Sequence, residues 1–322
     1  MTLPLDIAVS PYHLATREAP AMAALVLGTS VVTFLPHPAA GTSRHAVLDA
    51  VERSPRYLRL LEAWRWSTPL WRAGIISAVI DGHAPCDAIG AVYEDVRADP
   101  AFTELRPLMS AMDRLRDENA AAYLDAMSND LLRGGPDPGI SIPVNAALER
   151  FGADHGYILA RGVISSIAQR AEARLGVKVF SIGIPLLLQA GGRRLLELRE
   201  DLADTLEPLR SAITDLLSEP TSDPVRLQTA AAAYAADFSA WVEAGLAAGD
   251  DDTGKRVVPG YVGLNCLHMP EDAVLRSSRA AVRAMRGAWS GGEPHPPTAT
   301  EQHPPRGRFT IIIRELSVRP EV

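Results

Sequence analysis

The chain has 322 residues, of which 47% are hydrophobic and 22% charged, a composition typical of folded globular proteins. Its 32 basic and 39 acidic residues give a net charge of −7, which excludes a general electrostatic attraction to nucleic acid or acidic membranes. Two cysteines are too few for the disulfide framework of a small secreted protein.

The amino-terminal residues show no pattern of an export signal, because no basic segment precedes an apolar one. The longest uncharged apolar stretch, residues 19–36, is interrupted by Gly28 and contains Pro20 and Pro36. It therefore fits a helix followed by a strand better than a membrane span of about 20 residues. We expect a soluble, cytoplasmic protein.

Elements of the amino-terminal half follow from capping residues and hydrophobic spacing. Ser10 and Pro11 predict a helix start with Ser10 as the N-cap. Pro20 should break this helix, so that a separate short helical segment follows it. Ser54 and Pro55 predict another start, at the beginning of a largely helical stretch. The expected strands are residues 5–9 and 31–35, and the largely helical stretch runs over 54–133.

A glycine- and proline-rich segment at 134–139 predicts a boundary, after which strands and helices alternate. Strands at 157–160 and 177–184 flank a helix at 166–175, which predicts a βαβ crossover if the strands are parallel neighbours. Two helices at 192–217 and 223–248 carry apolar seams and predict an antiparallel hairpin, with a kink at Pro208. Further strands are expected at 257–269 and near the carboxyl end.

The expected fold class is α+β: predominantly helical, with a small mixed sheet of sequence-distant strands and one βαβ unit. We divide the chain into a mostly helical region, 1–133, and an α/β region, 140–322. The second region contains the helical hairpin 192–248 and a carboxyl-terminal strand 308–318. One continuous domain is the alternative division.

The sequence lacks the specific motifs of nucleotide binding and esterase chemistry: it has no G-x-G-x-x-G after a strand, no phosphate-binding P-loop and no G-x-S-x-G. Gly162, Ser165 and Ser166 could present backbone amides to an anion at the start of a helix. A plain strand-to-helix turn with a serine cap is the simpler interpretation.

His13 and Arg17 lie four residues apart on the expected first helix and share one face. The pair would suit a catalytic site, with His13 as a general base and Arg17 as a clamp for an anionic substrate. Glu18, five residues from His13, is expected to point elsewhere. A first-turn histidine and a surface arginine without a catalytic role are the competing interpretation.

A zinc site is a weak hypothesis that combines His83 and Cys86 with Cys266 and His268. About 180 residues separate the two halves, and Cys266 also fits a small core residue. We therefore predict no metal and no other cofactor.

Trp64, Trp66 and Trp71 form the densest aromatic segment of the chain. Helical spacing places Trp64 in the core, whereas Trp66 lies on a different side of the helix. Trp66 and Trp71 could form the wall of a ligand site, or they could pack against another helix.

Basic residues concentrate near the carboxyl end, where residues 253–322 carry 10 basic and 6 acidic side chains against 22 and 33 in the rest. Arg276, Arg279, Arg283 and Arg286 would form a stripe on one side of a helix and could bind a partner or an anion. A solvated face, or pairing with the protein's own carboxylates, is the alternative.

The sequence thus predicts a partner-binding or regulatory protein that uses helical surfaces and the arginine stripe. The alternative is an enzyme that acts on a small anionic substrate through His13 and Arg17. The expected partner is a protein or a small anionic ligand, and nucleic acid is not expected.

Overall fold

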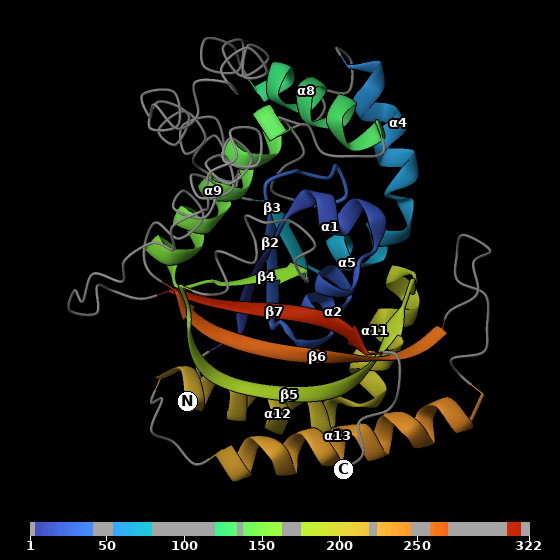
Figure 1. The fold of residues 1–322 in the computed structure, drawn as a ribbon. Helices are drawn as coiled ribbons and strands as arrows, with labels where there is room; N and C mark the ends of the chain where they lie inside the picture. Colours follow the sequence, from blue (N-terminus) through green and yellow to red (C-terminus); the bar gives the residue numbers. More distant parts are fainter. Residues whose placement is uncertain are drawn as a thin grey trace, which may run out of the picture.

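A seven-stranded mixed sheet forms the centre of the computed structural model, in the order β3-β2-β1-β4-β7-β6-β5 (Figure 1). The structure describes residues 4–40, 54–78, 120–133, 138–162, 175–218, 224–245, 258–269 and 308–316. The strands are β1 (Asp6–Val9), β2 (Ser30–Thr33), β3 (Ile76–Ala78), β4 (Ile158–Gly162), β5 (Val177–Leu188), β6 (Val258–Met269) and β7 (Arg308–Leu316).

Five neighbouring strands, β3, β2, β1, β4 and β7, are paired in parallel. β6 runs antiparallel to both β7 and β5, so β5 points in the same direction as the parallel strands. The carboxyl ends of β1, β2, β4 and β5 therefore lie along one edge of the sheet. The order 3-2-1-4 is that of doubly wound sheets, in which the connections diverge between β1 and β4.

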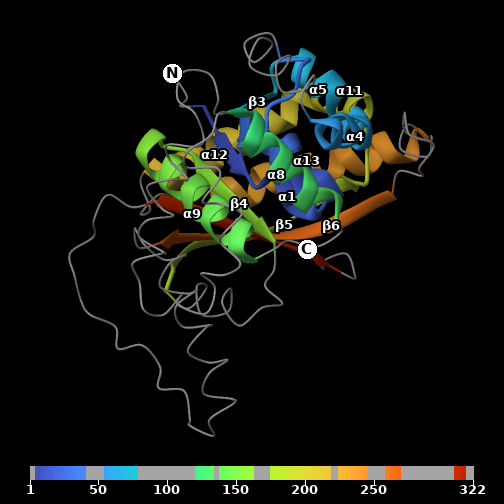
Figure 2. The same cartoon turned by 90° about the horizontal axis from the view of Figure 1, so that it is seen from above.

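Helices pack on the sheet from more than one side. Figure 1 shows α8 and α9 above β4 and β7, and α12 and α13 below β5; Figure 2 gives the view from above. The helical elements are α1 (Pro11–Thr16), α2 (Ala19–Leu27), α4 (Pro55–Ala63), the 3₁₀ turn η1 (Arg65–Ser67), α5 (Thr68–Arg72), α8 (Ala120–Leu132), α9 (Pro138–His155), α11 (Gly192–Asp201), α12 (Ala203–Ser218) and α13 (Pro224–Glu243).

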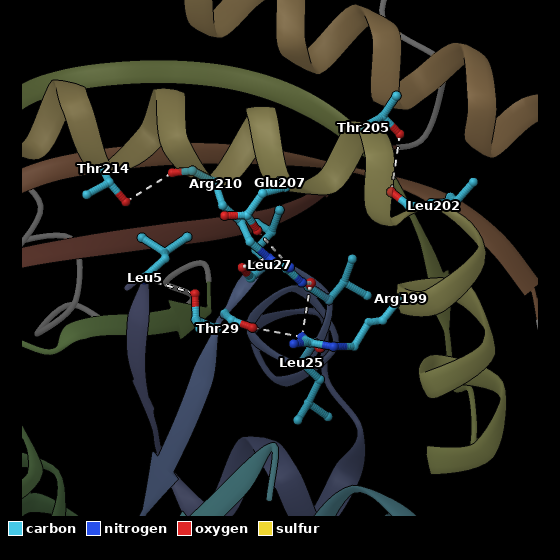
Figure 3. Close-up of polar contacts among 12 residues, drawn as sticks. Leu5, Leu25, Leu27, Thr29, Arg199, Leu202, Thr205, Glu207, Arg210 and Thr214 are labelled. Carbon is cyan, nitrogen blue, oxygen red and sulfur yellow. Dashed lines mark hydrogen bonds and ion pairs between the residues drawn. The ribbon is translucent and has the colours of Figure 1, made fainter. Parts of the chain in front are cut away.

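Helix α2 lies in the interior, because all nine of its residues are apolar and all are buried. Its carboxyl-terminal carbonyl groups are not exposed to water and need donors from elsewhere in the fold. Arg199 of α11 donates to the carbonyl oxygens of Leu25 and Gly28 at 2.6 and 2.7 Å. Arg210 of α12 donates to that of Leu27 at 2.8 Å (Figure 3). Two guanidinium groups thus cap this helix end and oppose its negative dipole.

Several predicted elements are confirmed. α1 begins at Pro11, a second helix begins next to Pro20, and Ser54 caps α4 by accepting the Tyr57 N–H at 3.1 Å. α12 and α13 pack against each other as predicted from their seams. The expected seam residues are buried with one exception: Gly245, the last residue expected in the second seam, is exposed and lies beyond the end of α13. The buried ones are Leu195, Leu198, Leu202, Leu209, Ile213 and Leu216 in the first seam, and Leu227, Ala231, Tyr234, Phe238 and Trp241 in the second.

Other expectations need correction. The fold is mixed α/β, and its seven-stranded sheet is larger than the small sheet expected. The two strands of the expected βαβ unit, β4 and β5, are not neighbours, because β7 and β6 lie between them. The expected helix 192–217 is divided at Leu202 into α11 and α12, whereas the kink expected at Pro208, which lies inside α12, stays a prediction.

The expected division of the chain crosses this sheet. β1 belongs to region 1–133 and β4 to region 140–322, yet the two strands are hydrogen-bonded neighbours, with Ile7 opposite Ile158. The carboxyl-terminal strand, β7, lies between β4 and β6. The two regions thus contribute strands to a single sheet.

Candidate functional site

The connection that follows β1 lies beside the end of β4, at the point where the order of the strands in the sheet reverses. In parallel sheets, ligands bind in the crevice outside the carboxyl ends of the strands at such a switch point. Ser10 and helix α1 follow β1 directly, and Gly162 is the last residue of β4. Side chains on these segments are therefore the first candidates for a functional site.

His13 and Glu18 form a close pair at this point, with 2.7 Å between Nδ1 and Oε2. The other oxygen of the carboxylate, Oε1, lies 2.7 Å from the hydroxyl group of Thr16. The expectation that Glu18 points away from His13 is therefore wrong. It assumed a continuous helix, whereas α1 ends at Thr16 and Arg17 adopts the left-handed conformation with φ 55°.

The electrostatics of Glu18 reflect this pairing. The hydrogen bond from His13 lowers the pKa of the Glu18 carboxyl group below its ordinary value. Partial burial opposes this effect, and the Thr16 hydroxyl group adds to it. Glu18 is thus an anion at neutral pH, able to orient the imidazole and to stabilise its protonated form.

Gly162 faces the second nitrogen of the same imidazole. Its backbone N–H donates to His13 Nε2 at 3.4 Å, which fits the tautomer that carries its proton on Nδ1 toward Glu18. A Cβ atom at Gly162 would lie 3.4 Å from Cε1 of His13 and 3.5 Å from Cγ of Pro20. The end of β4 thus closely approaches α1 and the start of α2.

Two further polar pairs connect this edge to α8 and α9. The Ser10 hydroxyl group donates to Oδ1 of Asn145 on α9 at 2.8 Å, so Ser10 does not cap α1 with its side chain as expected. The Tyr12 hydroxyl group donates to the buried carboxylate of Asp130 on α8. Sequence reasoning missed Asn145 and Asp130, since neither carries a local signal for a contact more than 100 residues away.

Arg17, the second residue of the expected catalytic pair, lies in the interior, with only 6% of its surface exposed. Its Nη1 donates to the carbonyl oxygen of Gln189 at 2.7 Å, and its guanidinium carbon lies 5.0 Å from the centre of the Trp66 ring. The alternative of a surface arginine is therefore wrong. His13 lies on α1 and Arg17 directly follows this helix, but it is Glu18 that contacts the imidazole.

The tryptophans of the aromatic segment are buried. Trp64 is a core residue as expected, and Trp66 packs under Arg17. Trp71 donates its indole N–H to Ser67 at 3.1 Å and stacks on His37. These contacts of Trp66 and Trp71 join the rings to other parts of the protein, and a role of the two residues as a ligand wall stays a prediction.

The hypothetical zinc ligands are only partly described. His83 and Cys86 lie outside the described residues. Cys266 is a buried free thiol in the main core, and burial raises its pKa to about 12, while His268 lies against the Phe309 ring. Among the residues with described positions, no three His, Cys, Asp or Glu side chains form a group that could hold a metal ion.

The arginine stripe, Arg276, Arg279, Arg283 and Arg286, and the two serines proposed beside Gly162 also lie outside the described residues. Within the described ranges, no helix combines the length and the apolar character needed to span a membrane.

Comparison with known proteins adds no assignment to this geometry. The chain matches no protein-family model, no curated protein and no solved structure.

Proposed function

We propose that the chain is an enzyme that acts on a small polar substrate at the carboxyl ends of β1 and β4, with His13 as the general base. The observation that supports this proposal most strongly is the 2.7 Å contact between His13 Nδ1 and Glu18 Oε2. A carboxylate that accepts the Nδ1 proton leaves the lone pair of the imidazole on Nε2, where a substrate proton would replace the long 3.4 Å hydrogen bond from the Gly162 N–H.

The location of the pair supports the same proposal. Nε2 is directed toward the end of β4, at the switch point where doubly wound sheets bind ligands. The His13 side chain is 18% exposed, so it is confined but still reachable from solvent. In the proposed step, Nε2 removes a proton from the substrate, and Glu18 stabilises the imidazolium that forms.

This proposal can be tested with a panel of small carboxylates, phosphate esters and alcohols, with binding followed by thermal shift and turnover by NMR. We expect at least one compound to be converted by the wild-type chain but not by His13→Gln. His155→Gln is the matched control, because His155 is an exposed histidine at the far end of α9 that bonds to the Phe151 carbonyl group.

Two outcomes contradict the proposal. Turnover that survives His13→Gln removes the general-base role. Thermal stabilisation by several compounds with turnover of none indicates a binding protein instead.

A second proposal, partner binding through the arginine stripe, rests on the charge split between residues 253–322 and the rest of the chain. Reversal of Arg279 and Arg283 to glutamate should abolish capture of a partner in a pull-down. Reversal of Arg59 and Arg65, which are exposed on and next to α4, serves as the control. Unchanged recovery with the first pair contradicts this proposal.

A further inference from the structure

Arg17 occupies a backbone position that usually belongs to glycine. The Arg17 N–H donates to the Leu14 carbonyl group and the Glu18 N–H to that of His13, at 3.3 and 3.1 Å. These two bonds, with φ 55° at Arg17, form a Schellman motif in which Arg17 is the left-handed residue. The left-handed conformation is unfavourable for residues that have a Cβ atom, so other contacts must stabilise an arginine at this position.

The motif decides where Glu18 lies. In a continuous helix, residue 18 would be about 140° around the axis from residue 13 and could not contact it. The left-handed residue reverses the chain, and the Glu18 carboxylate returns to the level of the His13 ring. The geometry of the catalytic pair thus depends on the conformation of Arg17.

The side chain of Arg17 stabilises this conformation through contacts with residues that do not belong to the motif. It lies over the Trp66 ring and donates to the carbonyl oxygen of Gln189, the residue after β5. Gln189 also has a positive φ, 59°, and its side-chain amide donates a hydrogen bond to the Arg17 carbonyl group at 3.4 Å. The two residues with positive φ therefore each donate a side-chain hydrogen bond to the backbone carbonyl group of the other.

We infer that Arg17 is a positioning residue, which holds Glu18 against His13 by anchoring the loop after α1 to Trp66 and Gln189. This inference rests on the proposed function of the His13–Glu18 pair. It replaces the role of Arg17 as a substrate clamp, because the guanidinium group is buried against protein partners. The carboxyl end of β5 thereby becomes part of the support of the site.

The test measures the tautomer of His13 by long-range ¹H–¹⁵N NMR in the full chain, which requires no substrate. Arg17→Gly keeps the left-handed conformation accessible but removes the anchor. Arg17→Gln keeps a side chain that is too short to reach both partners. Arg65→Gln is the control, since Arg65 is an arginine of the 3₁₀ turn with 78% of its side chain exposed.

In the wild-type chain we expect the Nδ1–H tautomer, and in Glu18→Ala we expect its loss. Both Arg17 variants should move the tautomer ratio at least halfway to that of Glu18→Ala, Arg17→Lys should restore part of it, and Arg65→Gln should leave it unchanged. A wild-type ratio in either folded Arg17 variant overturns the inference and leaves the proposed function intact. A wild-type chain without the Nδ1–H preference instead contradicts the proposed function.

Discussion

His37 stacks on Trp71 with ring centroids 5.5 Å apart and ring planes 15° from parallel. Its Nδ1 accepts the N–H of Ala39 at 3.0 Å, so the neutral ring is held just after β2. Burial, with a smaller contribution from the charge of Arg72, lowers the pKa of His37 from 6.5 to about 4. A buried neutral histidine makes the stability of the fold depend on pH.

This dependence has a definite sign. Below pH 6.5 the unfolded chain binds a proton at His37 that the folded chain does not bind until about pH 4. The free energy of unfolding should therefore fall as the pH drops through this window, by about 3 kcal/mol at 1.36 kcal/mol per pKa unit. Urea unfolding measured across the window checks this prediction.

His37→Asn supplies the control, because its side-chain oxygen can replace Nδ1 as the acceptor for Ala39 but does not titrate. Its stability should vary less with pH than that of the wild-type chain. Equal pH dependence of the two proteins would show that another group is responsible.

The guanidinium groups at the end of α2 should be among the strongest contributors to stability. Burial and the neighbouring charge of Arg210 lower the pKa of Arg199 to about 10, which still leaves it charged at neutral pH. Arg199→Met leaves buried carbonyl groups without a donor and should lower the free energy of unfolding by at least about 2 kcal/mol. Arg210→Met should act similarly, and because both groups donate to Val26 the two losses should not add.

Arg226→Met is the matched control for these arginines, because Arg226 pairs with Asp215 at the surface. An exposed pair contributes about 0–1 kcal/mol, so chemical unfolding should hardly change. A comparable loss in all three variants would argue against a special role of the α2 cap.

Two glycine-to-alanine substitutions should have opposite effects. A Cβ at Gly192 would lie 2.6 Å from the Trp66 carbonyl oxygen, a backbone atom that cannot easily move, so Gly192→Ala should destabilise the fold by about 1–3 kcal/mol. A Cβ at Gly152 would make only ordinary contacts with Tyr157, and alanine favours helix α9 by up to about 1 kcal/mol. Thermal unfolding of the two variants should therefore shift in opposite directions, and a rise with Gly192→Ala would contradict the close packing of η1 against α11.

Local chemistry in the sequence predicts the elements better than their arrangement. Ser54 with Pro55, and the seam from Leu227 to Trp241, are short-range signals, and the structure confirms both. The insertion of β7 between β4 and β6 depends on the pairing of β7 with β4, which lies more than 100 residues earlier, and the sequence has no local signal for this pairing.

The candidate site shows the same limit. His13 could be named from its position on the first helix, but its partner Glu18 could not, because a left-handed arginine gives no signal comparable to glycine at a helix end. The contact from Gly162 to His13 likewise depends on β1 and β4 being neighbours. The predicted site thus lacked Glu18 because the sequence does not indicate the chain reversal at Arg17. It lacked the Gly162 contact because the sequence does not indicate the order of the strands.

The central claim, that His13 and Glu18 act as one catalytic unit, is tested most directly by kcat/KM in a double-mutant cycle on a substrate from the panel. His13→Gln should lower kcat/KM by about 10²–10⁴-fold, Glu18→Gln by less, and the double variant by no more than His13→Gln alone. Glu197→Gln, which removes a carboxylate paired with Arg194 at the same 2.7 Å distance, should leave kcat/KM unchanged. Fully multiplicative losses in the double variant, or no loss with His13→Gln, would contradict the account.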